Sequence, residues 1–312
     1  MKKGTLATIL GALAVFFSAA LWGVDGIVLR PSLYDLSVYI VVFLEHLIAF
    51  AFMSPFFIRE LKETKKLNLV DWISMGLVAL LGGAIGTIAI TKSLFIVGFH
   101  GYTELSSLSG VLILQKLQPV FAILLAIFFL GEKPKKSFYP WAIVALLGSY
   151  LITFGFYTPQ FSSNSFFTAS MLSLLAAVSF GSSTVLGKRV LNRINFRVTT
   201  YLRFGFTSLI MLVIIAITNK FAAFSSVSLH PHITTLVLIA FTTGGAAIFL
   251  YYWGLKKIMA SRATLYELGF PFTAIVLDFI VNGQLMSPGQ FLGAGLIILS
   301  IIVITRQEAE KT

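Results

Sequence analysis

The sequence predicts an all-α integral membrane protein with ten transmembrane helices, arranged as two inverted five-helix repeats. Three observations lead to this prediction. The chain is 57% hydrophobic and 11% charged, with a mean hydropathy of +0.93, whereas soluble domains carry about 25% charged residues. Apolar runs of about 20 residues, long enough to cross the hydrocarbon core of a bilayer, recur along the whole chain. Two long stretches of the chain also resemble each other.

The apolar runs define the predicted spans in chain order. They are 6–29, 36–57, 72–97, 108–130, 138–157, 168–187, 198–218, 233–255, 264–282 and 288–305. The first follows a basic start, as a signal peptide would. It is longer than a signal core, lacks a small-residue cleavage pattern and precedes further spans, so we interpret it as a helix. The sequence contains no cysteine, which excludes disulfides and thiolate chemistry.

Lys and Arg are distributed unequally between alternate loops. Eighteen of the 23 fall in the loops of one side and at the chain ends, whereas only Arg30 and Lys220 fall in the loops of the other side. Cytoplasmic loops are enriched in Lys and Arg, so both termini are predicted to be cytoplasmic, in a multi-pass protein of the plasma (inner) membrane. The net charge of +11 therefore reflects topology and contact with the lipid bilayer. No nucleic-acid partner is expected, because no loop is long enough to form a folded basic surface.

The second half of each repeat carries the clearer similarity. Residues 115–153 and 267–305 align without a gap, and the offset of 152 residues places Pro119 on Pro271. Each stretch consists of two apolar segments around a short turn that contains glycine. The duplication is a pointer to function, because many carriers are built from internal repeats.

The first halves of the repeats align more weakly, with Glu45 on Arg203. The alignments divide the chain into 1–160 and 161–312, with five spans in each unit. Because five is odd, the second unit must enter the membrane from the opposite side. Inverted repeats of this kind suit a carrier that opens alternately to the two sides of the membrane.

Each repeat contains a proline inside an apolar span. Pro119 and Pro271 remove the hydrogen bond to the carbonyl four residues earlier, which belongs to Gln115 in the first repeat and Glu267 in the second. Irregular backbone at membrane depth is tolerated where it is buried in protein or lines a wet cavity. A structural kink would explain either site alone, whereas the same arrangement in both repeats favours a cavity.

Ionisable side chains inside the spans are functional candidates, because each costs about 2.5–3.5 kcal/mol on insertion scales. Glu45 lies deepest. Arg203 begins the seventh span, so it would reach the headgroups or form an ion pair with Glu45. His46 would serve in a proton relay or bond to a neighbouring helix. Lys116, beside Gln115, would reach the external surface or the cavity.

Aromatic residues in the spans have two interpretations. Trp22 and Tyr252 would stack on a cargo or a cation, or they would belong to the packing and the interfacial belt, which is the commoner role.

An extra segment distinguishes the first repeat from the second. Phe99–Gly110 has no counterpart in the second repeat and is predicted to be external. It would be either a tolerated loop insertion or a lid over an external opening.

No catalytic or metal-binding motif appears in the sequence. There is no His-x-x-x-His, no Gly-x-Ser-x-Gly and no Walker sequence. We therefore expect no enzyme activity, no metal and no cofactor.

One motif resembles a known family. Pro119-Val-Phe-Ala-x-Leu-Leu-Ala, followed by Phe128-Phe-Leu-Gly131-Glu132, is similar to the signature that closes each half of EamA-type carriers of the drug/metabolite transporter superfamily. The second copy departs from it at Gly283-Gln284, and Glu45 stands where the family often has a basic residue. The resemblance covers nearly the whole chain and implies a plasma-membrane secondary carrier, often an exporter of amino acids or other small metabolites.

These observations together predict alternating-access transport, in the export direction, of a small metabolite such as an amino acid. Glu45 or Glu267 would take up a coupling proton. Proton-coupled efflux of lipophilic cations is the nearest alternative, followed by a cation permease or channel and by a membrane-embedded enzyme. The state of the chain, monomer or homodimer, is left open. The residues expected to line the cavity are Glu45, Gln115, Lys116, Arg203, Glu267, Trp22 and Tyr252.

Overall fold

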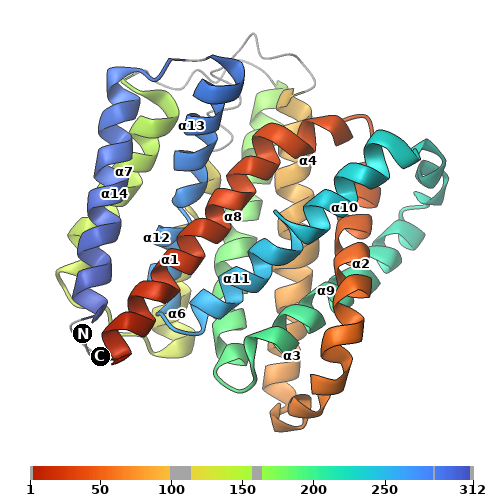
Figure 1. The fold of residues 1–312 in the computed structure, drawn as a ribbon, viewed down its shortest axis with the longest axis horizontal. Helices are drawn as coiled ribbons and strands as arrows, with labels where there is room; N and C mark the ends of the chain where they lie inside the picture. The colour runs from red at the N-terminus through yellow and green to blue at the C-terminus, as the bar shows by residue number, and fades with distance from the viewer. Residues whose placement is uncertain (1–2, 99–113, 157–163, 284, 310–312) are drawn as a thin grey trace.

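The computed structural model describes residues 3–98, 114–156, 164–283 and 285–309 (Figure 1). Within these ranges the chain is helical and contains no β-strand. The predicted all-α class is therefore confirmed. The segment Phe99–Gly110 lies outside the described residues.

The described helices fall into two halves of the chain. In the first half they are α1 (Lys3–Val24), α2 (Val38–Phe57), α3 (Leu69–Leu77), α4 (Gly86–Gly98), α6 (Gln118–Leu130) and α7 (Phe138–Phe154). In the second half they are α8 (Asn164–Leu191), α9 (Phe196–Ile217), α10 (Thr234–Phe241), α11 (Gly245–Leu255), α12 (Ala260–Tyr266), α13 (Gly269–Asn282) and α14 (Pro288–Ala309). Short π and 3-10 segments extend several of them, namely η1 (Asp25–Leu29), η2 (Arg30–Leu33), η3 (Ile58–Lys66), η4 (Val78–Ile85), η5 (Phe221–Ser226) and η6 (Leu229–Ile233).

Eight helical stretches in the described part of the chain are long and apolar enough to cross a membrane. The apolar helices α6 and α7 are shorter than the others. Large apolar side chains face outward, including Phe128, Phe129 and Ile217, which are 80%, 67% and 76% exposed. Side chains of this kind are stable against lipid and costly against water. The chain is therefore a multi-pass membrane protein.

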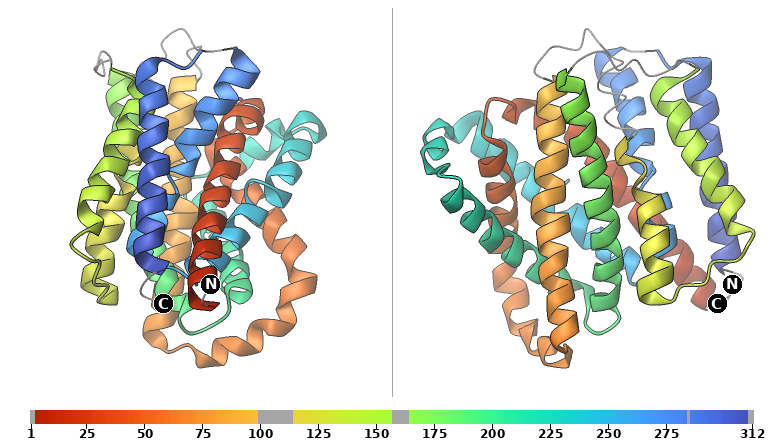
Figure 2. Two further views of the ribbon diagram at one scale, coloured as in Figure 1. Left: turned by 60° about the vertical axis from the view of Figure 1, so that its left-hand side comes forward. Right: turned by 180° about the vertical axis from the view of Figure 1, so that it is seen from behind.

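The helices of the two halves pack against each other in reciprocal pairs. The π segment η4 and helix α4 pack on α8, and the counterpart of this contact is α11 on α1. Helix α6 also packs on α8, and its counterpart is α13 on α1. Helix α2 packs on α9, and α7 on α14; Figures 1 and 2 show the last pair side by side. These main contacts between the halves are thus reciprocal.

Three stretches are interrupted near the middle of the molecule. Helix α12 gives way to α13 through a turn at Glu267 and Leu268, and a turn at Lys116 and Leu117 precedes α6. Residues 242–244 separate α10 from α11. Each turn lies just before a proline or a glycine, as expected for residues that cannot donate a helix hydrogen bond or that tolerate irregular backbone.

The π segment η4 contains paired glycines that permit close helix packing. A Cβ on Gly82 would collide with Ser183 of α8, and a Cβ on Gly83 would collide with Thr207 of α9. The same logic holds at Gly293 of α14, where a Cβ would press on the backbone of α7. Small residues of this kind are typical of helix contacts in membranes.

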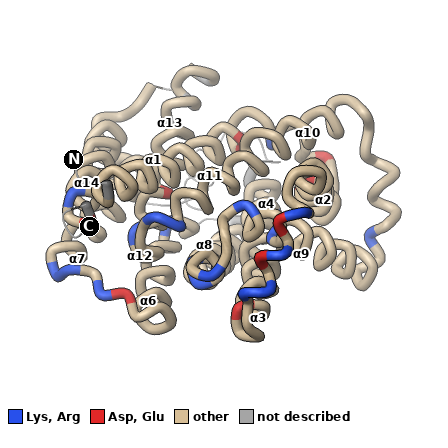
Figure 3. Tube along the Cα trace, turned by 60° about the horizontal axis from the view of Figure 1, so that its bottom comes forward, with Lys and Arg blue, Asp and Glu red and all other residues tan. Residues whose placement is uncertain are grey.

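The chain ends lie together at one end of the molecule, where basic residues also gather. Figures 1 and 3 show the N and C marks side by side and Lys and Arg at the nearby ends of α7, α8, α9 and α12. The same end contains the fully buried Asp71, whose Oδ1 lies 3.1 Å from Arg189 Nε. Asp71 also completes a capping box with Asn68 at the start of α3.

Candidate functional site

A cavity lined by both apolar and polar side chains lies between the two halves of the chain. It is bordered by the interruptions before α6, between α10 and α11, and between α12 and α13, so irregular backbone meets the cavity at each of these places. The residues that line the cavity include Trp22, Asp25, Arg30, Glu45, His46, Gln115, Lys116, Gln118, Phe180, Arg203, Phe204, Thr243, Tyr251, Glu267 and Phe270.

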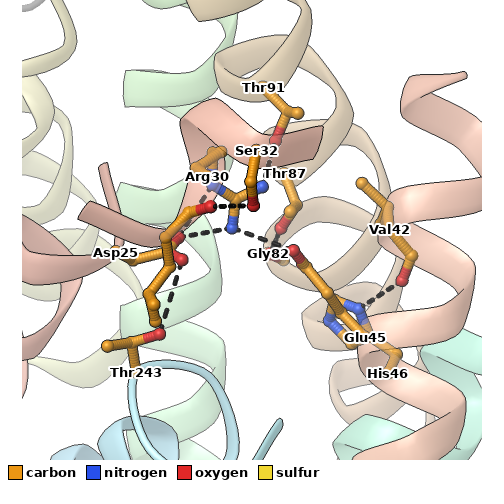
Figure 4. A network of polar contacts seen from close by, with 11 residues as sticks. Asp25, Arg30, Ser32, Val42, Glu45, His46, Gly82, Thr87, Thr91 and Thr243 are labelled. Carbon is orange, nitrogen blue, oxygen red and sulfur yellow. Dashed lines mark hydrogen bonds and ion pairs between the residues drawn. The ribbon is translucent and has the colours of Figure 1, made fainter. Parts of the chain in front are cut away.

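One side of the cavity is formed by an ionic cluster of Asp25, Arg30 and Glu45 (Figure 4). Arg30 Nε donates to Asp25 Oδ2 at 2.8 Å, and Arg30 Nη2 lies 3.0 Å from Glu45 Oε1. Arg30 Nη1 donates to Thr91 Oγ1 at 3.2 Å, and Thr243 Oγ1 donates to Asp25 Oδ1 at 3.4 Å. The three charged side chains are at most 10% exposed. One guanidinium therefore serves two carboxylates in a largely dry site.

The local backbone explains how Arg30 reaches this depth. Helix α1 continues without a break into the π segment η1 and then the 3-10 turn η2, in which Pro31 follows Arg30. The widened π turn contains Asp25 and ends just before Arg30, so the two side chains meet within the same stretch. π-Bulges of this kind are frequent at functional sites.

His46 is adjacent to Glu45 on α2 but makes a different contact. Its Nδ1 lies 2.8 Å from the carbonyl of Val42, which only accepts, so Nδ1 carries the hydrogen. The ring lies against Phe204, with ring centroids 5.4 Å apart. His46 thus bonds to its own helix rather than to a neighbouring one.

A chain of hydrogen bonds crosses the other side of the cavity. Lys116 Nζ donates to Gln115 Oε1 at 2.7 Å, and Gln115 Nε2 donates to Gln118 Oε1 at 3.1 Å. Gln118 Nε2 then donates to Glu267 Oε2 at 2.7 Å, while Tyr251 donates its hydroxyl hydrogen to Glu267 Oε1 at 2.7 Å. Both oxygens of Glu267 are therefore acceptors, and the chain joins the two proline-containing interruptions.

Aromatic rings surround this hydrogen-bonded chain. The ring centroids of Trp22 and Tyr251 are 5.6 Å apart, and Lys116 Nζ lies 3.9 Å from the centre of the Phe270 ring. Phe180 and Phe204 also line the cavity. The site thus offers flat apolar faces together with hydrogen-bonding groups.

Arg203 occupies the boundary between these two regions. Its Nη2 donates to the carbonyl of Gly82 in the π segment η4 at 3.1 Å, and its Nη1 donates to the Tyr252 hydroxyl at 3.1 Å. Its Nε is buried without a hydrogen-bond partner. Among the described residues, no carboxylate lies within ion-pair distance of it.

Comparison with known proteins gives the family. The model of the EamA-like transporter family matches residues 9–154 and again residues 167–306. The chain belongs to the EamA-like transporter family. The predicted resemblance is therefore confirmed, and the family is one of transporters rather than enzymes.

Individual relatives agree with this assignment. The EamA protein is 47% identical over 298 residues to a protein named riboflavin transporter ImpX of Fusobacterium nucleatum subsp. nucleatum, covering 95% of this chain and 97% of that one. It is 24% identical over 208 residues to the uncharacterized transporter YwfM of Bacillus subtilis, covering 66% and 67% of the two chains. A solved crystal structure, 16% identical, has a TM-score of 0.71 and matches 98% of both chains, which shows a shared fold.

Two sequence-based interpretations are corrected by the EamA structure. Arg203 does not lie at the headgroups, because it is the eighth residue of α9 and only 7% exposed. Glu45 does not form its ion pair with Arg203; its partner is Arg30, which the sequence analysis places in an external loop. The apolar run that defines the first span ends at residue 29, and the pattern does not show that α1 continues through η1 and η2.

The remaining predicted residues fall at or near the cavity. Glu267, Gln115, Lys116 and Trp22 line it, and Pro119 follows the turn that precedes α6. Pro271 follows the turn between α12 and α13, and Tyr252 lies outside the lining, fully buried behind Tyr251.

Sequence reasoning missed Gln118, and it did not separate Tyr251 from Tyr252 among the aromatic candidates. Gln118 carried a usable signal, because it lies between Gln115 and Pro119 at the predicted break. Tyr251 carried none that separates it from Tyr252, since both are aromatic residues of one apolar helix.

Proposed function

We propose that this EamA transporter is a secondary carrier of the plasma membrane that moves riboflavin or a closely related flavin by alternating access. The observation that carries the proposal is the cavity lined by aromatic rings and amide side chains between the two halves. A flavin has a flat three-ring heterocycle, ring carbonyls and N–H groups, and a polyhydroxyl chain. The aromatic rings of the cavity match the heterocycle, and its amide side chains match the ring carbonyls and N–H groups.

The rings and amides match the heterocycle. Aromatic side chains interact with planar rings in offset or edge-to-face arrangements, and Trp22, Phe180 and Tyr251 offer such faces. Gln115 and Gln118 carry amide groups that both donate and accept, which is what an imide edge with alternating carbonyl and N–H groups requires. Ligand sites are typically lined by apolar side chains with a few polar groups that fix orientation.

The charges of the cavity favour an uncharged cargo. Three carboxylates line the cavity, those of Asp25, Glu45 and Glu267. They are equal in number to its cationic side chains, which are Arg30, Lys116 and Arg203. With equal numbers of the two signs, the cavity has no excess carboxylate to serve as the counter-ion of a lipophilic cation. Riboflavin is uncharged at neutral pH and needs no counter-ion.

The relatives support the same cargo. The protein that is 47% identical over nearly its whole length is named a riboflavin transporter. For this reason we propose a flavin in place of the amino acid that the sequence alone suggested.

We further propose ten spans in two inverted units, 1–160 and 161–312, with both termini in the cytoplasm. The reciprocal packing of α1 on α11 and α13, and of α8 on α4 and α6, supports a twofold relation between the units. The basic residues gathered at the end that holds both chain ends support the orientation. In such an architecture, each half can adopt the conformation of the other and so reopen the cavity to the opposite side.

Transport by purified protein tests the proposal. Proteoliposomes loaded with unlabelled riboflavin should exchange it for external radiolabelled riboflavin in a saturable manner. Excess flavin analogues that retain the three-ring system should compete, whereas leucine and tetraphenylphosphonium should not. Absence of riboflavin exchange, or competition by leucine as strong as that by the flavin analogues, would contradict the flavin assignment. Unsaturable flux would contradict a carrier mechanism.

A further inference from the structure

We infer that Glu45 is the site that binds and releases the coupling proton of this carrier, with the neighbouring Asp25–Arg30 pair holding its carboxylate at the cavity. The inference rests on the proposed carrier function. It also separates two residues, Glu45 and Glu267, that the sequence left as equal candidates.

The hydrogen bonds of Arg30 are directed to partners other than Glu45. Arg30 Nε and Nη2 both donate to Asp25 Oδ2, and Nη1 donates to Thr91. The second oxygen of Asp25 accepts from Thr243. Asp25 and Arg30 thus form a satisfied, charge-neutral pair.

Glu45 shares the cation that Asp25 already holds. Its Oε1 lies 3.0 Å from Arg30 Nη2 in an ion pair, with no further donor to this buried atom among the described residues. Glu45 therefore brings a second negative charge to a guanidinium that Asp25 already neutralises. A net charge in a largely dry site is costly. One proton on Glu45 would remove that charge and would break none of the hydrogen bonds of the cluster.

The elements packed around Glu45 carry one other base, His46. On α9, Arg203 is directed to the Gly82 carbonyl and to Tyr252, whereas His46 on α2 is bonded through Nδ1 to its own helix and keeps Nε2 as its basic atom. Helix α10 and the π segment η4 carry no ionisable residue. On α4, Lys92 is exposed and does not line the cavity.

Glu267 has the opposite environment. Its Oε2 accepts from the Gln118 amide nitrogen, which can only donate, and its Oε1 accepts from Tyr251. Lys116 supplies a positive charge at the far end of the same chain of hydrogen bonds. A proton on Oε2 would face the Gln118 amide hydrogens, so protonation there would break the hydrogen bond between Gln118 and Glu267.

A proton fits the cluster better than a metal ion. The guanidinium of Arg30 lies between the two carboxylates, where a cation would have to bind. The part of the chain that the structure describes also contains no group of three or more His, Cys, Asp or Glu side chains suited to a metal. Mixed ionisable residues of this kind inside spans often mark proton relays.

The proton step is simple to balance. With the cavity open to one side, water takes the proton from the Glu45 carboxyl group, and the electron pair of the O–H bond remains on the carboxylate. After the cavity reopens to the other side, Glu45 takes up a proton from water there. Each complete cycle therefore moves one proton from the second side of the membrane to the first.

The test separates exchange of cargo from coupling to protons. Wild-type protein, Glu45→Gln, Glu45→Asp and Glu267→Gln are reconstituted into proteoliposomes. Riboflavin exchange without a gradient and riboflavin accumulation driven by a pH gradient are then measured. Asp35→Asn is the matched control, because Asp35 is a carboxylate that is 66% exposed outside the cavity.

The inference expects wild type, Glu45→Asp and Asp35→Asn to accumulate riboflavin in response to the pH gradient. Glu45→Gln should exchange riboflavin at a changed rate but lose gradient-driven accumulation at least tenfold. Glu267→Gln should lose affinity for riboflavin and keep the dependence on the gradient. Accumulation by Glu45→Gln equal to wild type would overturn the inference, as would a wild type that exchanges riboflavin but responds only to a sodium gradient. A wild type without riboflavin exchange would overturn the proposed function as well.

A measurement on the wild type guards against variants that fail to fold. The infrared carbonyl band of a protonated carboxyl group should appear on acidification of the purified full-length protein and vanish on return to neutral pH. The same band should be absent from folded Glu45→Gln and present in Glu267→Gln. A titrating band that persists in Glu45→Gln would assign the proton to another carboxyl group and overturn the inference.

Discussion

At the scale of single residues, the hydroxyl of Tyr251 holds the anion of the cavity in place. It donates to Glu267 Oε1, while the Gln118 amide donates to Oε2. A buried acceptor that loses its donor retains the cost of desolvation, about 1–3 kcal/mol. The position of the Glu267 carboxylate therefore depends on two neighbours that carry no charge.

We expect Tyr251→Phe to raise the KM for riboflavin about tenfold, which corresponds to about 1.4 kcal/mol. The reason is that one Glu267 oxygen loses its donor. Saturation kinetics in proteoliposomes measure the effect. Tyr266→Phe is the matched control, because Tyr266 is equally buried, also makes a hydroxyl hydrogen bond and does not line the cavity. A similar rise in KM for both variants would contradict the role assigned to Tyr251.

At the scale of helical elements, close packing and capping hold the irregular segments in place. The π segment η4 approaches α8 and α9 so closely that Gly82 and Gly83 have no space for a side chain. The short helix α12 begins where Glu132, in the loop after α6, accepts hydrogen bonds from the backbone nitrogens of Ala260 and Ser261 at 2.7 and 3.0 Å. The glutamate of the Gly131-Glu132 motif thus caps a helix of the other half.

We expect Gly82→Ala to lower the free energy of unfolding by about 1–3 kcal/mol, because the new methyl group collides with Ser183. Gly76→Ala is the control, since a Cβ there meets nothing within 4 Å. It should raise stability by up to about 1 kcal/mol through helix propensity. Unfolding in detergent provides the measurement. Equal destabilisation by both substitutions would rule out the packing explanation.

We expect Glu132→Ala to cost about 1–2 kcal/mol of stability, because the first N–H groups of α12 and the Ser261 hydroxyl lose their acceptor. Lys136→Ala, an exposed change in the same loop, should alter stability by at most about 0.5 kcal/mol. Thermal unfolding of the two variants side by side is the appropriate comparison. A loss as small for Glu132→Ala as for Lys136→Ala would mean that solvent replaces the cap.

At the scale of the whole molecule, the two halves meet through reciprocal contacts around one cavity. Glu45 and Arg203 are each the eighth residue of their helices, α2 and α9, which pack on each other. This matched placement supports the proposed twofold relation between the units, and the two side chains are opposite in charge. A symmetric scaffold suits alternation between two conformations, and the different side chains give each side of the cavity its own chemistry.

The orientation is testable because the natural chain contains no cysteine. We expect Lys220→Cys to react with a membrane-impermeant thiol reagent in intact cells, since Lys220 lies in the connection after α9 on the sparsely basic side. Lys136→Cys should react only after the cells are made permeable. Mass shifts after labelling report both results. The reverse pattern would invert the proposed topology.

The sequence by itself determined the all-helical membrane class, the family and several of the residues that line the cavity, because these depend on composition, proline position and a repeated motif. Gln115 and Glu267 could be selected because a proline four residues later marks a break in the helix wherever it lies. The partner of Glu45 could not be predicted. Whether Arg30 lies in a loop or at the cavity depends on a π turn in α1 and on packing against α2 and α4. Tertiary structure alone decided that Arg30 is shared by two carboxylates, because helix depth and rotation are set by contacts between elements distant in sequence.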